Sequence, residues 1–184
     1  MSYADKFFEI VNTVQRTGIG DFLDWLVEET DFLTAPASAK YHGCETGGLL
    51  KHSLAVYYNL CNLAHDEYSN NTIAIVALFH DICKANFYEE FMRNVKDKET
   101  GIWSEVKSFR INEQFPYGSH GGKSVYLMLS HGLHLYDEEA IAINNHMGGW
   151  DVTPYHNPSG AFTKYHLPVY LHIADIMATY IDKQ

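Results

Sequence analysis

The sequence lacks the features that direct a chain into a membrane or out of the cell. No apolar stretch approaches the ~20 residues that a membrane-spanning helix needs. Residues Met1–Lys6 have neither the basic start nor the apolar centre of a signal peptide. The three cysteines include no CxxC pair and form no disulfide framework. These absences predict a cytoplasmic protein with reduced thiols and no membrane partner.

Positive charge is also scarce. The chain has 13 Lys and Arg residues against 23 Asp and Glu residues, which gives a net charge of -10. An acidic surface repels a phosphate backbone, so extended binding to DNA or RNA is disfavoured. A small phosphorylated substrate held by a few local cations remains compatible with this charge.

Histidine and apolar side chains are abundant, at 11 residues and 46% of the sequence. A chain of 184 residues with this apolar content predicts a single packed domain over residues 1–184. The excess of histidine points to metal ligands, because neutral imidazole is a common one.

The most informative stretch is Ile73–Lys84, in which seven apolar residues run directly into His80 and Asp81. Adjacent helical side chains point about 100° apart, so these two reach one ion only from a helix end or a bent last turn. A buried carboxylate needs a cation or a strong donor, and a metal ion would satisfy both side chains. The alternative is a helix whose last turn is simply polar.

Apolar residues at helical spacing predict an all-α body. The expected helices cover residues 3–16, 21–29, 49–68, 72–84, 120–130, 138–147 and 168–181. Apolar and polar residues alternate loosely on both sides of the turn Asp97–Gly101, which predicts a small β-hairpin insertion around residues 91–111. The hairpin carries basic residues that face either solvent or a substrate: Arg93, Lys96, Lys107 and Arg110.

Six histidine and aspartate residues fall near the ends or on the apolar faces of five helices. Because each helix must bury its apolar face against the others, these side chains are expected to converge. Nitrogen and oxygen ligands without a thiolate suit Fe, Mn, Mg, Co, Ni or Zn in an octahedral or five-coordinate site. The six residues are His52, His80, Asp81, His120, His146 and Asp175.

The order of these residues resembles that of the HD-domain metal-dependent phosphohydrolase superfamily. Gly47–Leu54 is similar to its first-histidine helix, and His80–Lys84 is similar to its HDxxK signature. His172–Asp175 resembles its closing aspartate helix. Locally, His146–Asp175 looks most like the HD domains of bacterial 3′→5′ exoribonucleases. The resemblance covers roughly residues 40–182.

The resemblance implies an HD-domain helical bundle, with the N-terminal helices of residues 3–29 packed on it. It implies cleavage of a phosphoester or phosphoanhydride by a metal-activated hydroxide. A first metal ion would be held by His52, His80, Asp81 and Asp175. A second would be held by His120 and His146, with Asp81 bridging the two ions, which together clamp the phosphoryl oxygens. The sequence leaves the identity of the metal open.

Side chains near this centre are candidates for contact with the substrate. Lys84 lies one helical turn after His80 on the same side and, with Asp81, is expected to act in catalysis. Its alternative role is that of a C-terminal lysine favoured by the helix dipole. The other candidates for substrate contact are Lys123, His42, Arg110 and His156.

The chain departs from the resemblance at two points. Related HD proteins often carry a His-His pair where this chain has Asn145 and His146, which leaves open whether one or two ions bind. The nucleic-acid-binding OB domain that precedes the HD domain in the exoribonucleases does not occur in this sequence. Together with the net charge of -10, this favours nucleotides or other small phosphates over polynucleotides.

The sequence therefore predicts a metal-dependent phosphohydrolase of a nucleotide or another small phosphorylated substrate. One alternative is a 3′→5′ exonuclease on short single strands, with bases stacked on Trp103, Phe109, Trp150 and Tyr155. A second alternative is a non-catalytic, metal-bound module that senses a ligand. The substrate stays open, as does a homodimer formed through the aromatic-rich surface loops.

Overall fold

The computed structural model describes residues 1–40, 43–112, 114–151 and 157–182. Its helices are α1 (Tyr3–Val11), α2 (Ile19–Glu28), α3 (Gly48–Ala64), α4 (Asn70–Phe79), α5 (His120–Ser130), α6 (Asp137–Asn145), α7 (Ser159–Lys164) and α8 (His166–Ile176). Short 3-10 turns cover Ile82–Lys84 and Gly148–Trp150, and a π-helical turn covers Met177–Ile181. The strands β1 (Tyr88–Lys96) and β2 (Trp103–Ile111) form one antiparallel hairpin.

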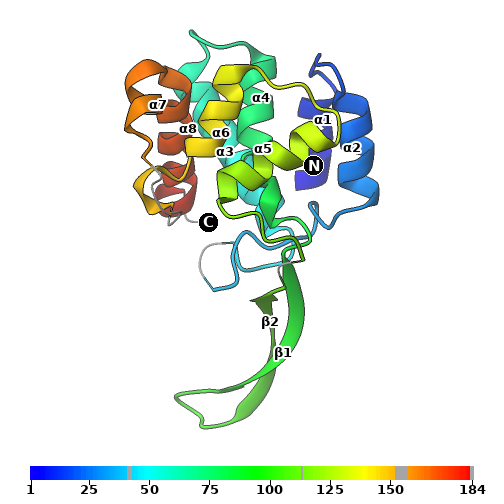
Figure 1. The fold of residues 1–184 in the computed structure, drawn as a ribbon. Helices are drawn as coiled ribbons and strands as arrows, with labels where there is room; N and C mark the ends of the chain where they lie inside the picture. The colour runs from blue at the N-terminus through cyan, green and yellow to red at the C-terminus, as the bar shows by residue number, and fades with distance from the viewer. Residues whose placement is uncertain (41–42, 113, 152–156, 183–184) are drawn as a thin grey trace.

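The helices pack into a body from which the hairpin extends as an arm (Figure 1). Helix α3 packs against α4 and α8, and α6 packs against α5 and α8. This arrangement confirms the predicted helical class with a small hairpin insertion. Within the described ranges, no helix has the length and apolar character needed to cross a membrane.

Helix α4 forms the centre of the core. All residues from Ile73 to Phe79 are at most 2% exposed, because other elements surround the helix on every side. Ser69 caps its start, where the side chain accepts a hydrogen bond from the Thr72 backbone at 3.2 Å. At its other end the Phe79 ring packs against Phe22 of α2, with the ring centroids 4.9 Å apart. The apolar run therefore anchors the helix that leads into the His-Asp pair.

The predicted helix over residues 72–84 was too long, since α4 ends at Phe79. His80 keeps helical backbone angles, whereas Asp81 (φ -108°, ψ 19°) leaves the helix and begins the turn Ile82–Lys84. The bend lies where the sequence required one. It allows two consecutive side chains to reach the same site.

Other helices also end earlier than predicted. Helix α1 ends at Val11 rather than at residue 16, and α3 ends at Ala64 rather than at residue 68. Tertiary contacts hold the residues beyond these ends in other conformations. Arg16, for example, forms an ion pair with Glu139 of α6. Helix ends in a packed protein follow such contacts more than intrinsic propensity.

Two glycines permit close approaches that position the first turns of α3 and α5. A Cβ atom on Gly48 would lie 2.1 Å from the carbonyl oxygen of Gly43. A Cβ atom on Gly121 would lie 2.3 Å from the carbonyl oxygen of Ile143 in α6. A side chain at either position would displace the loop before α3 or separate α5 from α6.

The hairpin begins at Tyr88, three residues before the predicted start, and its strands pair in continuous register. Acidic neighbours on the hairpin offset the charge of some of its basic side chains. Lys107 forms an ion pair with Glu90 at 2.5 Å, and Arg110 forms one with Glu89. Much of the positive charge expected on this arm is therefore neutralised within the arm itself.

Candidate metal centre

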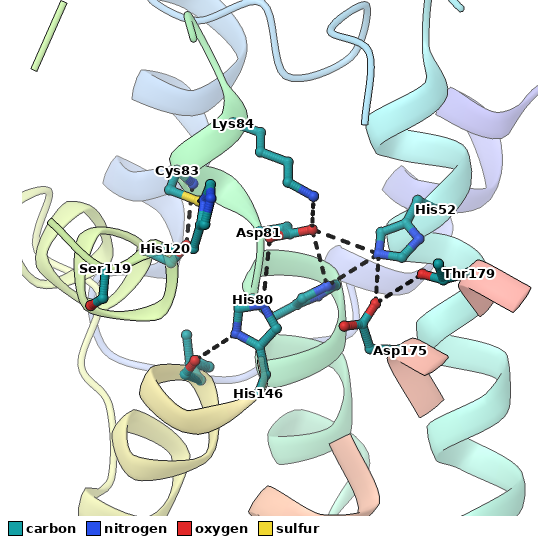
Figure 2. A network of polar contacts seen from close by, with 12 residues as sticks. His52, His80, Asp81, Cys83, Lys84, Ser119, His120, His146, Asp175 and Thr179 are labelled. Carbon is teal, nitrogen blue, oxygen red and sulfur yellow. Dashed lines mark hydrogen bonds and ion pairs between the residues drawn. The ribbon is translucent and has the colours of Figure 1, made fainter. Parts of the chain in front are cut away.

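Five side chains converge in the middle of the helical body, where Figure 2 shows them pointing toward one another. They are His52 from α3, His80 and Asp81 from the end of α4, His146 from the end of α6 and Asp175 from α8. His80 and His146 are fully buried, and Asp81 is 3% exposed. The structure thus brings together five of the six predicted ligands, and we refer to these five residues as the histidine-aspartate cluster.

The ligand atoms of the cluster lie close together. The Nε2 atom of His52 is 3.2 Å from Asp175 Oδ1 and 3.3 Å from His80 Nε2. His80 Nε2 is 3.5 Å from Asp81 Oδ2, and His146 Nε2 is 3.6 Å from Asp81 Oδ1. Atoms about 2.1 Å from one ion are themselves about 3–4 Å apart, so these separations suit metal coordination. Two triplets have ligand atoms all within 4.8 Å of one another: His52, His80 and Asp81, and His80, His146 and Asp175.

Backbone carbonyl groups fix the orientation of two of the imidazole rings. His80 Nδ1 donates to the Ala77 carbonyl at 2.8 Å, and His146 Nδ1 donates to the Ile143 carbonyl at 2.7 Å. With the proton on Nδ1, Nε2 of each ring carries a lone pair that faces the cluster. Metal-ligating histidines commonly use such a hydrogen bond to hold the ring and its tautomer.

Two buried atoms of the cluster have no hydrogen-bond partner, Asp81 Oδ1 and His146 Nε2. A buried polar atom left in this state costs roughly 1–3 kcal/mol. Since both atoms are acceptors in the tautomer just described, neither can satisfy the other. A cation between them satisfies both, so the residues of the cluster fit a divalent metal ion.

Electrostatic interactions keep both carboxylates of the cluster ionised and the His80 ring neutral, as a metal ion requires, whereas at His146 they favour the protonated ring. Burial by itself would raise the pKa of Asp81, but the Lys84 ammonium group and the neighbouring imidazoles hold it well below its usual range. Burial also opposes ionisation of Asp175, yet a hydrogen bond from a histidine lowers its pKa. Burial lowers the pKa of His80 and keeps that ring neutral. At His146 the Asp81 carboxylate outweighs burial and raises the pKa.

Lys84 reaches the cluster from the turn that follows α4. Its Nζ atom lies 2.5 Å from Asp81 Oδ2, and its side chain is 15% exposed. Burial by itself would lower the pKa of Lys84, but the Asp81 carboxylate raises it, so the ammonium group stays charged. The structure therefore places a cation at the solvent side of the cluster, as the HDxxK spacing predicts.

His120 stands apart from the other predicted ligands. It begins α5, and its Nδ1 atom lies 3.4 Å from the sulfur atom of Cys83 (Figure 2). Neither of the two ligand triplets found among the described residues includes it. Burial lowers the pKa of His120, which keeps its ring neutral. Its assignment to a second metal ion stays a prediction.

The structure distinguishes Asn145 from His146. The Asn145 side chain turns back along α6, where its Nδ2 donates to the Ile141 carbonyl at 2.8 Å. Asn145 also lines a cavity of ≈ 620 Å³ between α5 and α6. The residue of this pair that faces Asp81 is His146, so the departure at Asn145 leaves the cluster itself intact.

The remaining candidates for substrate contact come from other parts of the chain. Lys123 of α5 is 8% exposed, and its Nζ atom lies over the Phe87 ring, 5.4 Å from the centroid. Arg110 lies on the hairpin in its ion pair with Glu89. His42 and His156 fall outside the described residues. The contact of these four residues with a substrate stays a prediction.

Three residues that sequence reasoning did not select lie against the cluster. Thr179 Oγ1 donates to Asp175 Oδ1 at 3.4 Å, and His172 Nδ1 donates to the His146 carbonyl at 2.6 Å. Thr179 and His172 each lie one helical turn from Asp175, at i+4 and i-3 respectively. This helical spacing is the sequence signal that could have identified them. Tyr88 packs near the charged groups of the cluster, and burial raises its pKa to about 12. No sequence pattern indicates the position of Tyr88.

A buried convergence of histidine and aspartate ligands within packed helices defines a class of helical metal-binding proteins. The family model of the HD domain matches residues 49–179, a range that includes the whole cluster. The chain therefore belongs to the HD domain family, whose superfamily consists mostly of metal-dependent phosphohydrolases. Searches of curated proteins and of solved structures found no match.

Proposed function

We propose that the protein is a metal-dependent phosphohydrolase that cleaves a phosphoester or phosphoanhydride of a nucleotide or another small phosphorylated substrate. The observation that carries this proposal is the pair of buried acceptors without partners, Asp81 Oδ1 and His146 Nε2. Membership of the HD domain family supports the reaction class, although a fold does not determine its substrate.

The first ion would be held by His52, His80, Asp81 and Asp175, and a second by His146, Asp81 and His120. A divalent ion supplies two kinds of chemistry here, a lowered pKa of its water and compensation of negative charge on phosphoryl oxygens. All of these side chains offer nitrogen or oxygen, which suits Fe, Mn, Mg, Ni, Co or Zn.

The chain's own groups would orient and stabilise the reacting phosphate. Lys84 holds one oxygen of Asp81 and leaves the other directed at His146. The same ammonium group lies at the solvent side of the cluster, where it would meet a phosphoryl oxygen that gains negative charge. Since its position is fixed by Asp81 before substrate arrives, little reorganisation is needed during the reaction.

The charge distribution favours a small substrate over a strand of nucleic acid. Binding to a strand requires several cations along its phosphate backbone. On the hairpin, Lys107 and Arg110 are engaged by Glu90 and Glu89, and the chain as a whole carries a charge of -10. We therefore place the substrate among nucleotides and related small phosphates.

Elemental analysis of protein purified without chelator tests this function. We expect about two divalent ions per chain in the wild type if His120 contributes, about one if it does not, and none in the variant His80→Ala/Asp81→Ala. A screen of nucleotides and other phosphoesters with added Mn²⁺ or Fe²⁺ would then identify turnover. Equal metal content in wild type and variant, or absence of turnover in the metal-loaded wild type, would contradict the proposal.

A further inference from the structure

Helices α6 and α8 pack against each other, and each provides a residue of the histidine-aspartate cluster (Figure 1). His146 caps the end of α6, and Asp175 lies on α8. The ligand atoms of these two residues and of His80 all lie within 4.8 Å of one another. The position of the end of α6 relative to α8 therefore sets part of the ligand geometry.

A side chain of α8 binds the end of α6 directly. His172 Nδ1 donates to the backbone carbonyl of His146, with 2.6 Å between the nitrogen and oxygen atoms. The last carbonyl groups of a helix have no partner within the helix, so a side-chain donor at this point holds the helix end. His172 precedes Asp175 by three residues, which places both on one side of α8. One turn of α8 thus supplies the ligand Asp175 and holds the backbone of the ligand His146.

Aromatic rings and a close backbone contact hold the His172 ring in the orientation that this hydrogen bond requires. The ring centroids of Trp150 and Phe162 lie 5.7 and 5.6 Å from the centroid of His172. Gly148 passes the ring so closely that a Cβ atom there would lie 2.6 Å from His172 Cε1. The φ angle of Gly148, +56°, also favours glycine. Packing therefore orients the donor before any metal ion binds.

The other buried histidine at a helix end is held in a similar way. His80 caps α4, and in the turn that follows, the Cys83 backbone donates to Ser124 Oγ of α5 at 3.2 Å. His146 caps α6, and His172 of α8 provides the corresponding bond. At both sites the Nδ1 atom of the ligand ring donates to the carbonyl three residues earlier. The bond of the ring sets its tautomer, and the bond from the neighbouring helix holds the backbone that carries the ring.

We propose that His172 is a positioning residue for the metal centre. Its bond to the His146 carbonyl holds the His146 imidazole 3.6 Å from Asp81 Oδ1, a separation that one metal ion can bridge. This inference rests on the proposed function, because it concerns the ion that His146 binds there. His172 acts on that ion through the backbone of His146 and not as a ligand. Groups that hold metal ligands contribute roughly 10- to 100-fold to metal affinity.

Titration of the full chain with Mn²⁺, with unbound Mn²⁺ measured by electron paramagnetic resonance, tests the inference. We expect His172→Leu, which removes the donor, to weaken binding of the ion at His146 about tenfold. His172→Asn places an amide N–H where Nδ1 lies and should restore most of the affinity. His166→Leu removes an exposed histidine from the start of the same helix and should bind Mn²⁺ as the wild type does. If circular dichroism shows that His172→Leu is unfolded, His172→Ala takes its place.

A double-mutant cycle with His146→Ala distinguishes positioning of this ligand from a general loss of stability. Without the His146 ring, His172→Leu should change the affinity for the remaining ion less than about twofold, because its effect passes through His146. An equal loss of affinity in both backgrounds overturns the inference. Failure of His172→Asn to restore affinity also overturns it.

Phosphoester assays on the same proteins separate this inference from the proposed function. Turnover by the wild type, with unchanged Mn²⁺ affinity in His172→Leu, overturns the positioning role while the phosphohydrolase stands. Weakened Mn²⁺ binding in His172→Leu, without turnover by the metal-loaded wild type, supports the positioning role and contradicts the phosphohydrolase. A wild type that binds no Mn²⁺ overturns the inference.

Discussion

Arg16 and Glu139 form a buried ion pair between the N-terminal helices and α6, whereas Asp81 is buried in the histidine-aspartate cluster. Both Glu139 oxygens accept from the Arg16 guanidinium, at 2.5 and 2.8 Å. The Tyr136 backbone also donates to Glu139 at 2.9 Å, and Arg16 also donates to the His134 carbonyl at 3.2 Å. At Asp81, by contrast, one oxygen is held by Lys84 and the other has no donor.

Burial is similar in the two places, so burial does not separate them. The side chain of Glu139 is 2% exposed and that of Asp81 is 3% exposed. What separates them is whether the hydrogen bonds are complete. A purely structural ion pair requires a complete hydrogen-bond network, whereas an incomplete network leaves acceptor atoms that a ligand can use. We therefore assign Arg16 and Glu139 to stability and the cluster to function.

The largest effect is expected from Asp81→Asn. It removes a negative charge shared by His52, His80 and His146, so metal binding should fall below detection. Loss of several kcal/mol of transition-state stabilisation corresponds to a decrease of about 10³-fold or more in kcat/KM. Elemental analysis and phosphoester assays measure the two effects. A variant that keeps its full metal content would refute the ligand role of Asp81.

The opposite pattern is expected from Glu139→Gln, which leaves the Arg16 guanidinium buried beside a neutral partner. The free energy of unfolding should fall by about 3 kcal/mol, while metal content stays the same. Urea denaturation measures the change, and Glu28→Gln, at an exposed position of α2, is the matched control. A loss of metal without a loss of stability would reverse the assignment of the two sites.

Addition of metal provides a third comparison. A ligand at 100 times its dissociation constant stabilises the folded state by about 2.7 kcal/mol, which raises Tm by roughly 5–10 °C in a chain of this size. We expect Mn²⁺ to produce this shift in the wild type and in Glu139→Gln but not in Asp81→Asn. Thermal denaturation of chelator-treated protein, with and without Mn²⁺, is the measurement. An equal shift in all three proteins would place the ion elsewhere.

Lys84→Met should affect catalysis more than metal binding. The apolar stem of similar length keeps the packing, but the positive charge at the edge of the cluster is lost. We expect kcat to decrease about 10- to 100-fold at near-normal metal content. Lys98→Met on the hairpin controls for the change of charge. An unchanged kcat would return Lys84 to the role of a lysine that only neutralises Asp81.

The smallest effect is expected from Asn145→Ala. Its side chain bonds to the Ile141 carbonyl on its own helix and turns away from His146. Metal content and kcat should change less than about twofold, because neither ligand geometry nor charge is altered. His146→Ala at the neighbouring position should reduce metal content. If Asn145→Ala had the larger effect of the two, the assignment along α6 would be wrong.

The sequence by itself determined the helical class and the central feature of the site. The apolar run Ile73–Phe79 leads directly into His80 and Asp81. Because adjacent helical side chains point about 100° apart, these two residues can face one site only at a helix end. The ordered series of histidines and aspartates also indicated the HD domain family. Helical periodicity explains why His52 and Asp175 face inward.

Only the tertiary structure decided the rest. Thr179 and His172 support the cluster, and His120 lies beside Cys83. Helix α1 and residues 178–182 line a groove beside His52. These arrangements depend on how segments far apart in the sequence pack together. Local periodicity specifies which face of a helix is buried. It does not specify which distant side chain meets that face, because that depends on how all the helices pack together.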